Sequence, residues 1–189
     1  MTFDVMPGSE RLVAYPRERF ATSAVWDTFV DKHPAGAWWH RQAWLDYSLA
    51  YDRKAVDRSF AVVSEAAGYP YIVGLCPAIE HDGVVCMGDD PCAGPLITTQ
   101  PKLSAARAQA CHDAMVSSIQ ETLGGMEVAW RWNRYPHDYR NTIGDLAASL
   151  GLLYDTWETA VVKVWGGRGL GVAARDVTHK ARRETEPSG

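Results

Sequence analysis

Three β-forming segments separated by short turns occupy the middle of this 189-residue chain. They are residues 59–64 (SFAVVS), 71–79 (YIVGLCPAI) and 83–87 (GVVCM), with Gly68-Tyr69-Pro70 and His81-Asp82-Gly83 between them. Val, Ile and Phe favour strands, whereas Gly, Pro and Asp favour turns. Connections this short join antiparallel neighbours, so the sequence predicts an antiparallel meander.

Helical patterns lie on both sides of this meander. Before it, one helix is predicted by apolar residues at helical spacing, namely Val25, Trp26, Phe29 and Val30. Thr22-Ser23 precedes this helix, and His33-Pro34-Ala35-Gly36 ends it. A second helix follows, with an apolar side made of Trp44, Leu45, Leu49 and also Trp38. After the meander, the Ala-rich residues 102–123 predict the clearest helix of the chain, which ends at Gly124-Gly125.

The remaining elements complete a mixed order. A strand is expected at 11–15, and the elements after the long helix are a strand at 126–132, a helix at 141–150, a strand at 160–165 and a basic helix at 170–184. The order β-α-α-β-β-β-α-β-α-β-α predicts an α/β fold, with a mixed, largely antiparallel sheet and helices on both of its faces. We expect residues 1–10 to be a flexible terminus, 11–165 the domain, and 166–189 a basic helix with a tail.

Composition narrows the class of protein. Hydrophobic residues make up 47% and charged residues 22%, which are ordinary values for a globular domain. The net charge of -4 provides no basic field for DNA, and no apolar run is long enough for a membrane helix. The start of the chain does not resemble a secretory signal, and the four cysteines form no CxxC motif. A cytoplasmic protein with reduced cysteines and no membrane span is expected.

The chain has eight tryptophans, and five of them fall in two clusters. The clusters are Trp38-Trp39-Trp44 and Trp130-Trp132. Tryptophan fills a large volume, and its indole N–H requires a partner when buried. Two interpretations are open: a Trp-rich core, and an aromatic-walled groove that holds a ligand.

Four passages carry a resemblance to a known family. They are WDTFVDKHPAGAWWHRQAWLDYSLAY (26–51), AVVSEAAGYPYIVGLCPAI (61–79), CMGDDPCAGPLIT (86–98), and LGLLYDTWETAVVKV (150–164) followed by HKARRE (179–184). In this order they resemble the Fem-type peptidyl- and acyltransferases of the GNAT superfamily, which build peptidoglycan cross-bridges or transfer other acyl groups. The resemblance covers residues 26–184 as a series of short motifs.

The resemblance implies an activity and a set of partners. The expected reaction moves an acyl group from an acyl-coenzyme A thioester such as acetyl-CoA, or from aminoacyl-tRNA, to a small-molecule or peptide amine. No metal is expected. Family members carry two GNAT-like lobes, and the passage at 150–184 corresponds to the entry into the second. The chain is therefore expected to be an N-terminal lobe, weakly active alone, that pairs with a partner lobe or with a second copy of itself.

The resemblance also implies substrate contacts near the first tryptophan cluster. The candidate substrate-binding residues are Trp39, His40, Arg41, Trp44 and Arg182. Cross-bridge-forming members have a lysine one helical turn after the position of Trp44, where this chain has Ser48. A nucleotide-linked cell-wall precursor is therefore doubtful as the acceptor, unless Arg41 or Lys54 replaces that lysine.

A glycine-rich turn near the end of the chain fits the pyrophosphate signature R-x-x-G-x-A of GNAT enzymes. Its residues are Arg168, Gly169, Leu170, Gly171, Val172 and Ala173. The turn lies between a predicted strand and a predicted helix, so that free backbone N–H groups could hold a phosphate. The alternative is that the turn only connects the two elements, as it would between two Fem-type lobes.

The predicted helix after this turn is basic. Arg175, His179 and Arg182 share one face at spacings of four and three. That face could bind an anionic acyl carrier, a tRNA acceptor end or a phosphate. The alternative is a solvated helix whose C-terminal cations match the helix dipole.

Groups for direct chemistry are few in the sequence. Cys92 with His81 could act as a nucleophile and base, but nothing in the sequence supplies a third group to orient them. A metal site is not favoured by the irregular spacing of Cys76, His81, Cys86, Asp89, Asp90 and Cys92. Glu80 or Asp89 is the candidate general base. The competing hypotheses are a non-catalytic assembly module and a complete small GNAT acetyltransferase.

Overall fold

The computed structural model describes residues 11–65, 70–87, 94–98, 103–130 and 140–150. The chain divides into two compact units, Met1–Thr159 and Ala160–Gly189, and all described residues belong to the first. The predicted flexible terminus at 1–10, the predicted strand at 160–165 and the basic segment at 166–189 lie outside the described residues.

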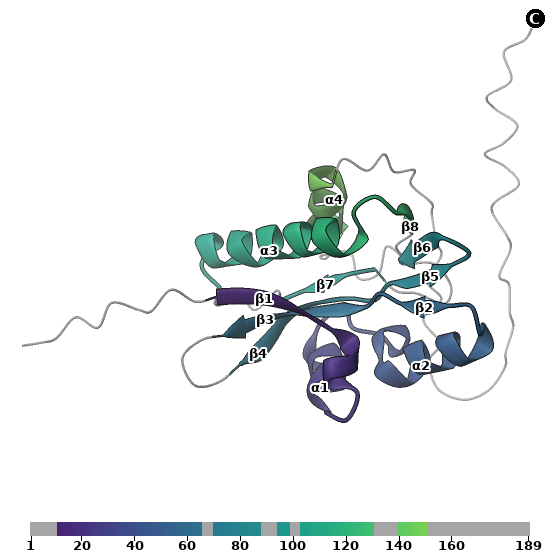
Figure 1. The fold of residues 1–189 in the computed structure, drawn as a ribbon. Helices are drawn as coiled ribbons and strands as arrows, with labels where there is room; N and C mark the ends of the chain where they lie inside the picture. Colours follow the sequence, from purple (N-terminus) through teal and green to yellow (C-terminus); the bar gives the residue numbers. More distant parts are fainter. Residues whose placement is uncertain (1–10, 66–69, 88–93, 99–102, 131–139, 151–189) are drawn as a thin grey trace, which may run out of the picture. The chain divides into compact units, whose positions relative to one another are not determined.

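The described residues form a mixed α/β fold (Figure 1). The strands are β1 (Arg11–Pro16), β2 (Val56–Asp57), β3 (Phe60–Glu65), β4 (Tyr71–Cys76), β5 (Ile79–His81), β6 (Val84–Met87), β7 (Leu96–Ile97) and β8 (Glu127–Trp130). The helices are α1 (Val25–Lys32), α2 (Gln42–Tyr51), α3 (Ala105–Leu123) and α4 (Arg140–Ser149), with short 3₁₀ turns η1 (Arg17–Phe20) and η2 (Trp38–His40). The predicted helices up to α4 occur in the predicted order. Between α2 and α3, however, the described residues contain six strands where three were predicted, because β2 and β7 are additional and the strand predicted at 71–79 is divided into β4 and β5.

The strands form two four-stranded sheets. One has the order β1-β3-β4-β7 and is antiparallel throughout. The other has the order β2-β5-β6-β8, in which β6 and β8 are parallel. The antiparallel meander predicted for the middle of the chain is confirmed. The parallel pair was not predicted, and it needs a long crossover connection, which here includes α3.

The strand expected at 71–79 is divided at Pro77 into β4 and β5, which belong to different sheets, and the strand expected at 59–64 is β3, which a break at Ser59 separates from β2. Asp57 pairs with Ile79 and Phe60 with Cys76, so the two broken residues face each other. Pro77 has no N–H to donate to the ladder. The Ser59 hydroxyl oxygen accepts the N–H of Ala78 at 3.0 Å in place of a backbone partner. This break separates β2 and β5 from the first sheet.

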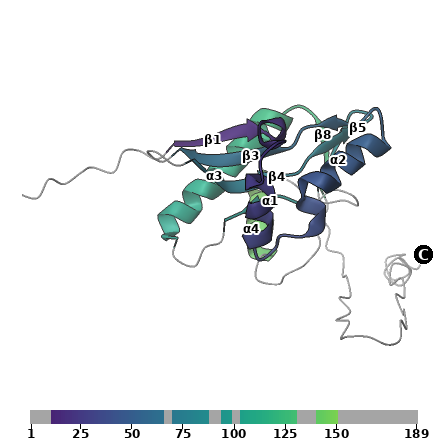
Figure 2. The same ribbon diagram turned by 90° about the horizontal axis from the view of Figure 1, so that it is seen from below.

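Helices cover both faces of the first sheet, as predicted. α3 contacts β1, β3, β4 and β7, whereas α1 contacts β4 (Figures 1 and 2). Two separate apolar cores result, one including Met115 and Ile119 of α3 and the other including Trp26 and Val30 of α1. Gly74 permits the close approach of α3, because a Cβ there would lie 2.6 Å from Met115 Cε.

Candidate functional site

Two buried histidines fix the segment that precedes α2. His33 Nδ1 accepts the N–H of Ala35 at 3.1 Å, and its Nε2–H donates to the carbonyl of Ile97 at 2.7 Å. His40 Nδ1 accepts the N–H of Ala37 at 3.1 Å, and its ring also hydrogen-bonds the backbone of Gly94. The segment containing these histidines is thereby joined to the segment at 94–97, two passages that the family resemblance had singled out separately.

Burial determines the charge state of these two rings. It lowers the pKa of His33 despite the hydrogen bond to Ile97. It lowers the pKa of His40 to about 4, against the opposing effect of the hydrogen bonds to Ala37 and Gly94. Both imidazoles are therefore neutral at neutral pH, and their ring nitrogens are used by the backbone.

Trp26 and Gln42 hold α1 against the start of α2. Trp26 is fully buried, and its indole N–H donates to the carbonyl of His40 at 2.8 Å. The backbone N–H of Gln42 donates to Asp27 Oδ1 at 3.0 Å, and the Gln42 amide donates to the carbonyl of Ser23 at 3.0 Å. These contacts fix the direction in which α2 leaves η2.

Five aromatic side chains follow one another along η2 and α2. We call them the aromatic row: Trp38, Trp39, Trp44, Tyr47 and Tyr51. The ring centroids of Trp38 and Trp44 are 4.0 Å apart, those of Trp44 and Tyr47 are 5.3 Å apart and stacked, and those of Tyr47 and Tyr51 are 6.2 Å apart. Aromatic pairs at such separations stabilise each other's positions.

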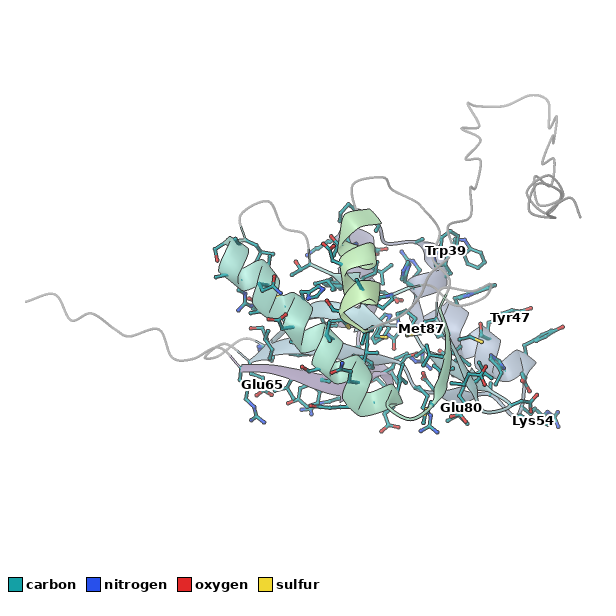
Figure 3. The ribbon with its side chains drawn as sticks, turned by 90° about the horizontal axis from the view of Figure 1, so that it is seen from above. Trp39, Tyr47, Lys54, Glu65, Glu80 and Met87 are labelled. Atoms are coloured by element: carbon teal, nitrogen blue, oxygen red, sulfur yellow. The ribbon has the colours of Figure 1, made fainter. Side chains whose placement is uncertain are left out.

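Three side chains of the aromatic row are exposed, and the other two, Trp39 and Trp44, are half-buried. Trp38 and Tyr47 are each 55% exposed and Tyr51 is 83% exposed. α2 buries Leu45 and Ser48 instead, and Figure 3 shows Tyr47 pointing away from the rest of the fold. Trp38 was expected on the apolar side of the second helix, and this is wrong because the residue belongs to η2 and faces outward.

Arg17 ties the outer side of α2 to β2. Its guanidinium lies 2.6 Å from Asp57 Oδ2 and 2.8 Å from Asp46 Oδ1, and its side chain is 9% exposed. Burial alone would lower the pKa of Arg17, but the two carboxylates more than reverse this effect, and the pKa lies above its ordinary value. The Arg17 cation is therefore compensated and serves to position α2.

A histidine and a carboxylate meet where α2 ends. Asp52 follows the last residue of α2, and its Oδ2 accepts a hydrogen bond from His81 Nδ1 at a distance of 2.9 Å. Its Oδ1 accepts the backbone N–H of Lys54, also at 2.9 Å. The hydrogen bond from His81 is the main cause that lowers the pKa of Asp52. The carboxylate is thus ionised and held from two sides.

His81 owes its position to a tight hairpin turn. It is the last residue of β5 and pairs with Val84, the first residue of β6. Asp82 and Gly83 between them both have positive φ, at 48° and 89°. Such a two-residue turn matches the twist of the strands, so the turn predicted at 81–83 is confirmed. The side chain of His81 is 28% exposed, so solvent and small molecules can reach it.

Ion pairs engage two of the charged residues close to this pair in the chain, Lys54 and Glu80. Lys54 Nζ lies 3.5 Å from Asp82 Oδ1. Arg58 lies 2.7 Å from Glu80 Oε2, which leaves Glu80 engaged rather than available as the candidate base. Figure 3 shows the positions of Lys54 and Glu80 on this part of the structure.

The structure brings together only some of the predicted site residues. Trp39 and Trp44 contact Trp38 in the aromatic row, and Arg41 pairs with Asp31. His40 is buried. Outside the described residues lie Arg182, the turn formed by Arg168, Gly169, Leu170, Gly171, Val172 and Ala173, and the side chains of the second tryptophan cluster.

Sequence reasoning missed Asp52 altogether. The sequence separates it from His81 by 29 residues, and only the pairing of β2 with β5 makes them neighbours. The one available signal was an acidic residue after a predicted helix together with a histidine before an Asp-Gly turn. Such residues are common at those positions for local reasons, so the signal is weak.

No protein-family model, curated protein or solved structure matches this chain. Among the described residues, no helix combines the length and the apolar character that crossing a membrane requires. The same residues contain no cluster of three or more histidine, cysteine, aspartate or glutamate side chains suited to a metal ion.

Proposed function

We propose that this chain is an acyl- or aminoacyltransferase of the GNAT-like, Fem-related type. Its donor is an acyl thioester or aminoacyl-tRNA, and its acceptor is an amine. The observation that supports this proposal is the joining of the His33 and His40 segment to the segment at 94–97, because both passages belong to the family resemblance. Two motifs that independently resemble one family are more informative when they form one structural unit.

The fold agrees with the proposal. The order of predicted elements favours a mixed, largely antiparallel sheet with helices on both faces, which is compatible with a GNAT-like lobe, and the described residues have this arrangement. The parallel strands β6 and β8, linked through α3, add an arrangement whose strand ends often border ligand sites. Since one fold serves many reactions, the activity itself needs a direct test.

The test is ligand-dependent thermal stability of the full chain. A ligand that binds only the native state raises the unfolding midpoint. We expect acetyl-CoA or an aminoacyl-tRNA to raise it, and we expect slow amide formation with a primary amine, detected by mass spectrometry. If Arg168→Glu abolishes the shift with acetyl-CoA, the glycine-rich turn holds the coenzyme. A folded chain whose midpoint responds to neither donor would contradict the proposed function.

A second candidate function is supported by the aromatic row. Exposed contiguous aromatic side chains are typical of protein interfaces. In this alternative the chain is a non-catalytic module whose aromatic row docks a partner lobe or a second copy. Light scattering over a concentration series distinguishes the two: the assembly function predicts a mass increase that the double variant Trp38→Ala/Tyr47→Ala removes. A constant monomer mass together with donor binding favours the transferase.

A further inference from the structure

His81 differs from the other histidines in the described part of the chain. His33 and His40 are buried, and their ring nitrogens bond to the backbone. His112 has its Nε2 buried without a hydrogen-bond partner. His81 is partly exposed, its Nδ1 contacts Asp52, and within the described residues its Nε2 has no hydrogen-bond partner.

The contact with Asp52 determines which nitrogen of His81 carries the proton. An ionised carboxylate only accepts hydrogen bonds, so the neutral imidazole must donate Nδ1–H to Asp52 Oδ2. The lone pair is then on Nε2, the nitrogen that has no hydrogen-bond partner in the described part of the chain. A carboxylate in this position also stabilises the imidazolium that forms when Nε2 takes a proton.

The surroundings of His81 favour proton transfer from a bound amine to its Nε2. Arg58 is paired with Glu80 and Lys54 with Asp82. Besides the hydrogen bond from His81, which is the main cause, the backbone N–H and the charge of Lys54 also lower the pKa of Asp52. The aromatic row ends at Tyr51, which precedes Asp52 in the chain and is 83% exposed. Asp57, on neighbouring β2, is bound by Arg17.

We propose that His81 is the general base for the acceptor amine and that Asp52 is its positioning residue, with the aromatic row holding the apolar part of the acceptor. This inference rests on the proposed acyl transfer. The amine nitrogen attacks the carbonyl carbon of the donor, a C–N bond forms, and the C–S bond of the thioester breaks. His81 Nε2 takes the proton that the nitrogen loses and returns it to the departing thiolate. The products are an amide and a free thiol.

With an aminoacyl-tRNA donor the balance is the same. The C–O bond of the ester breaks, and the proton returns to the departing hydroxyl oxygen. Glu80, the base suggested by the sequence, is less suited to this step because Arg58 binds its Oε2 at 2.7 Å.

One experiment tests Nε2 without requiring a substrate. Diethyl pyrocarbonate acylates accessible, unprotonated imidazole nitrogens, and peptide mass spectrometry reports each histidine separately. At about pH 8, where imidazoles are mostly neutral, we expect His81 to react at least roughly tenfold faster than His33 and His40. Asp52→Asn should slow the reaction of His81 several-fold, because the carboxylate no longer holds the proton on Nδ1. Equal rates for the three histidines would overturn the proposal.

The second experiment measures transfer from acetyl-CoA to a primary amine as a function of pH. Loss of a general base typically costs about 10²-fold in rate or more. We expect His81→Gln to lower kcat by this factor, with little change in the KM for the amine, and to remove the decline of kcat toward acid pH. The matched control is His112→Gln, which changes the same residue type on α3 and should leave kcat unchanged.

The outcomes separate the two claims. If the wild-type chain transfers the acetyl group and His81→Gln has the same kcat and pH profile, the role of His81 is refuted while the proposed function stands. If the folded wild-type chain transfers no acyl group from either donor class, both the proposed function and the role of His81 are refuted. If His81→Gln loses activity and Asp52→Asn loses part of it, both are supported.

Discussion

Histidine and tryptophan occur in two kinds of environment in this fold, with opposite consequences. We call the buried pair, Trp26 and His40, the inner side and the partly exposed residues, Trp38 and His81, the outer side. On the inner side, Trp26 and His40 are buried, and Trp26 donates its indole N–H to the carbonyl of His40. On the outer side, Trp38 is 55% exposed and His81 keeps one ring nitrogen without a partner in the described structure. The comparison teaches that the residue types alone do not mark a site. Burial and unused hydrogen-bonding capacity distinguish the structural side from the candidate functional side.

The largest expected difference between the two sides concerns tryptophan. Trp26→Ala should lower the free energy of unfolding by roughly 3–5 kcal/mol, because it removes a fully buried indole and its hydrogen bond. Trp38→Ala should lower it by less than about 1 kcal/mol, since much of that ring already lies in water. Urea denaturation of both variants makes the measurement. Similar losses of unfolding free energy in the two variants would show that the aromatic row stabilises the fold as much as the buried core does.

The same comparison applies to histidine. His40→Ala should lower the free energy of unfolding by roughly 2–4 kcal/mol, because it leaves a cavity and a backbone N–H of Ala37 without its partner. His81→Ala should change it by less than about 1 kcal/mol, since its ion pair with Asp52 is partly exposed. A larger loss for His81→Ala than for His40→Ala would reverse the assignment of the two sides.

Acid should weaken the inner side first. The pKa of His40 lies at about 4 in the fold against an ordinary 6.5, so the unfolded chain binds a proton at higher pH than the folded one. Stability is therefore full above pH 6.5 and falls as the pH drops toward about 4, by roughly 3 kcal/mol from this group. His33 acts in the same direction. Urea denaturation at several pH values in this range gives the free energy of unfolding as a function of pH. This free energy should fall less steeply with decreasing pH for His40→Gln than for the wild type.

Asp52 should produce the smallest effect, in a different pH range. Its pKa is lowered in the fold, chiefly by the hydrogen bond from His81. The stabilisation is present above the ordinary pKa of the carboxyl group and is lost as the pH falls through the lowered value. Acid titrations of wild type and Asp52→Asn should therefore converge at the acid end and differ slightly at neutral pH. Curves that diverge toward acid would contradict the sign of this shift.

Much of the fold was predictable from the sequence, because its signals are local. The turn at Asp82-Gly83 and the stop at His33-Pro34-Ala35-Gly36 were confirmed. The break at Ser59 and Pro77 was not predicted, because it depends on two residues that face each other across strands. The parallel pairing of β6 and β8 was missed for the same reason, since no local pattern specifies which distant strand a segment joins.

The candidate site was less predictable than the fold. The tryptophan cluster was compatible with a Trp-rich core, which the sequence favoured, and with an aromatic-walled groove, and the exposure of Trp38 and Tyr47 could not be read from the sequence. His40 was expected among the substrate contacts, and its environment gives it a structural role instead. The partnership of Asp52 and His81 arises from tertiary structure alone.

The most direct test of the difference between the two sides is the position of the proton on each ring. Long-range ¹H–¹⁵N NMR spectra of the histidines at about pH 8 report which nitrogen of a neutral imidazole is protonated. We expect Nε2–H for His33 and His40, and Nδ1–H with the lone pair on Nε2 for His81. An Nε2–H tautomer at His81 would contradict its role as a base, because the lone pair would then face Asp52 and Nε2 could accept no proton.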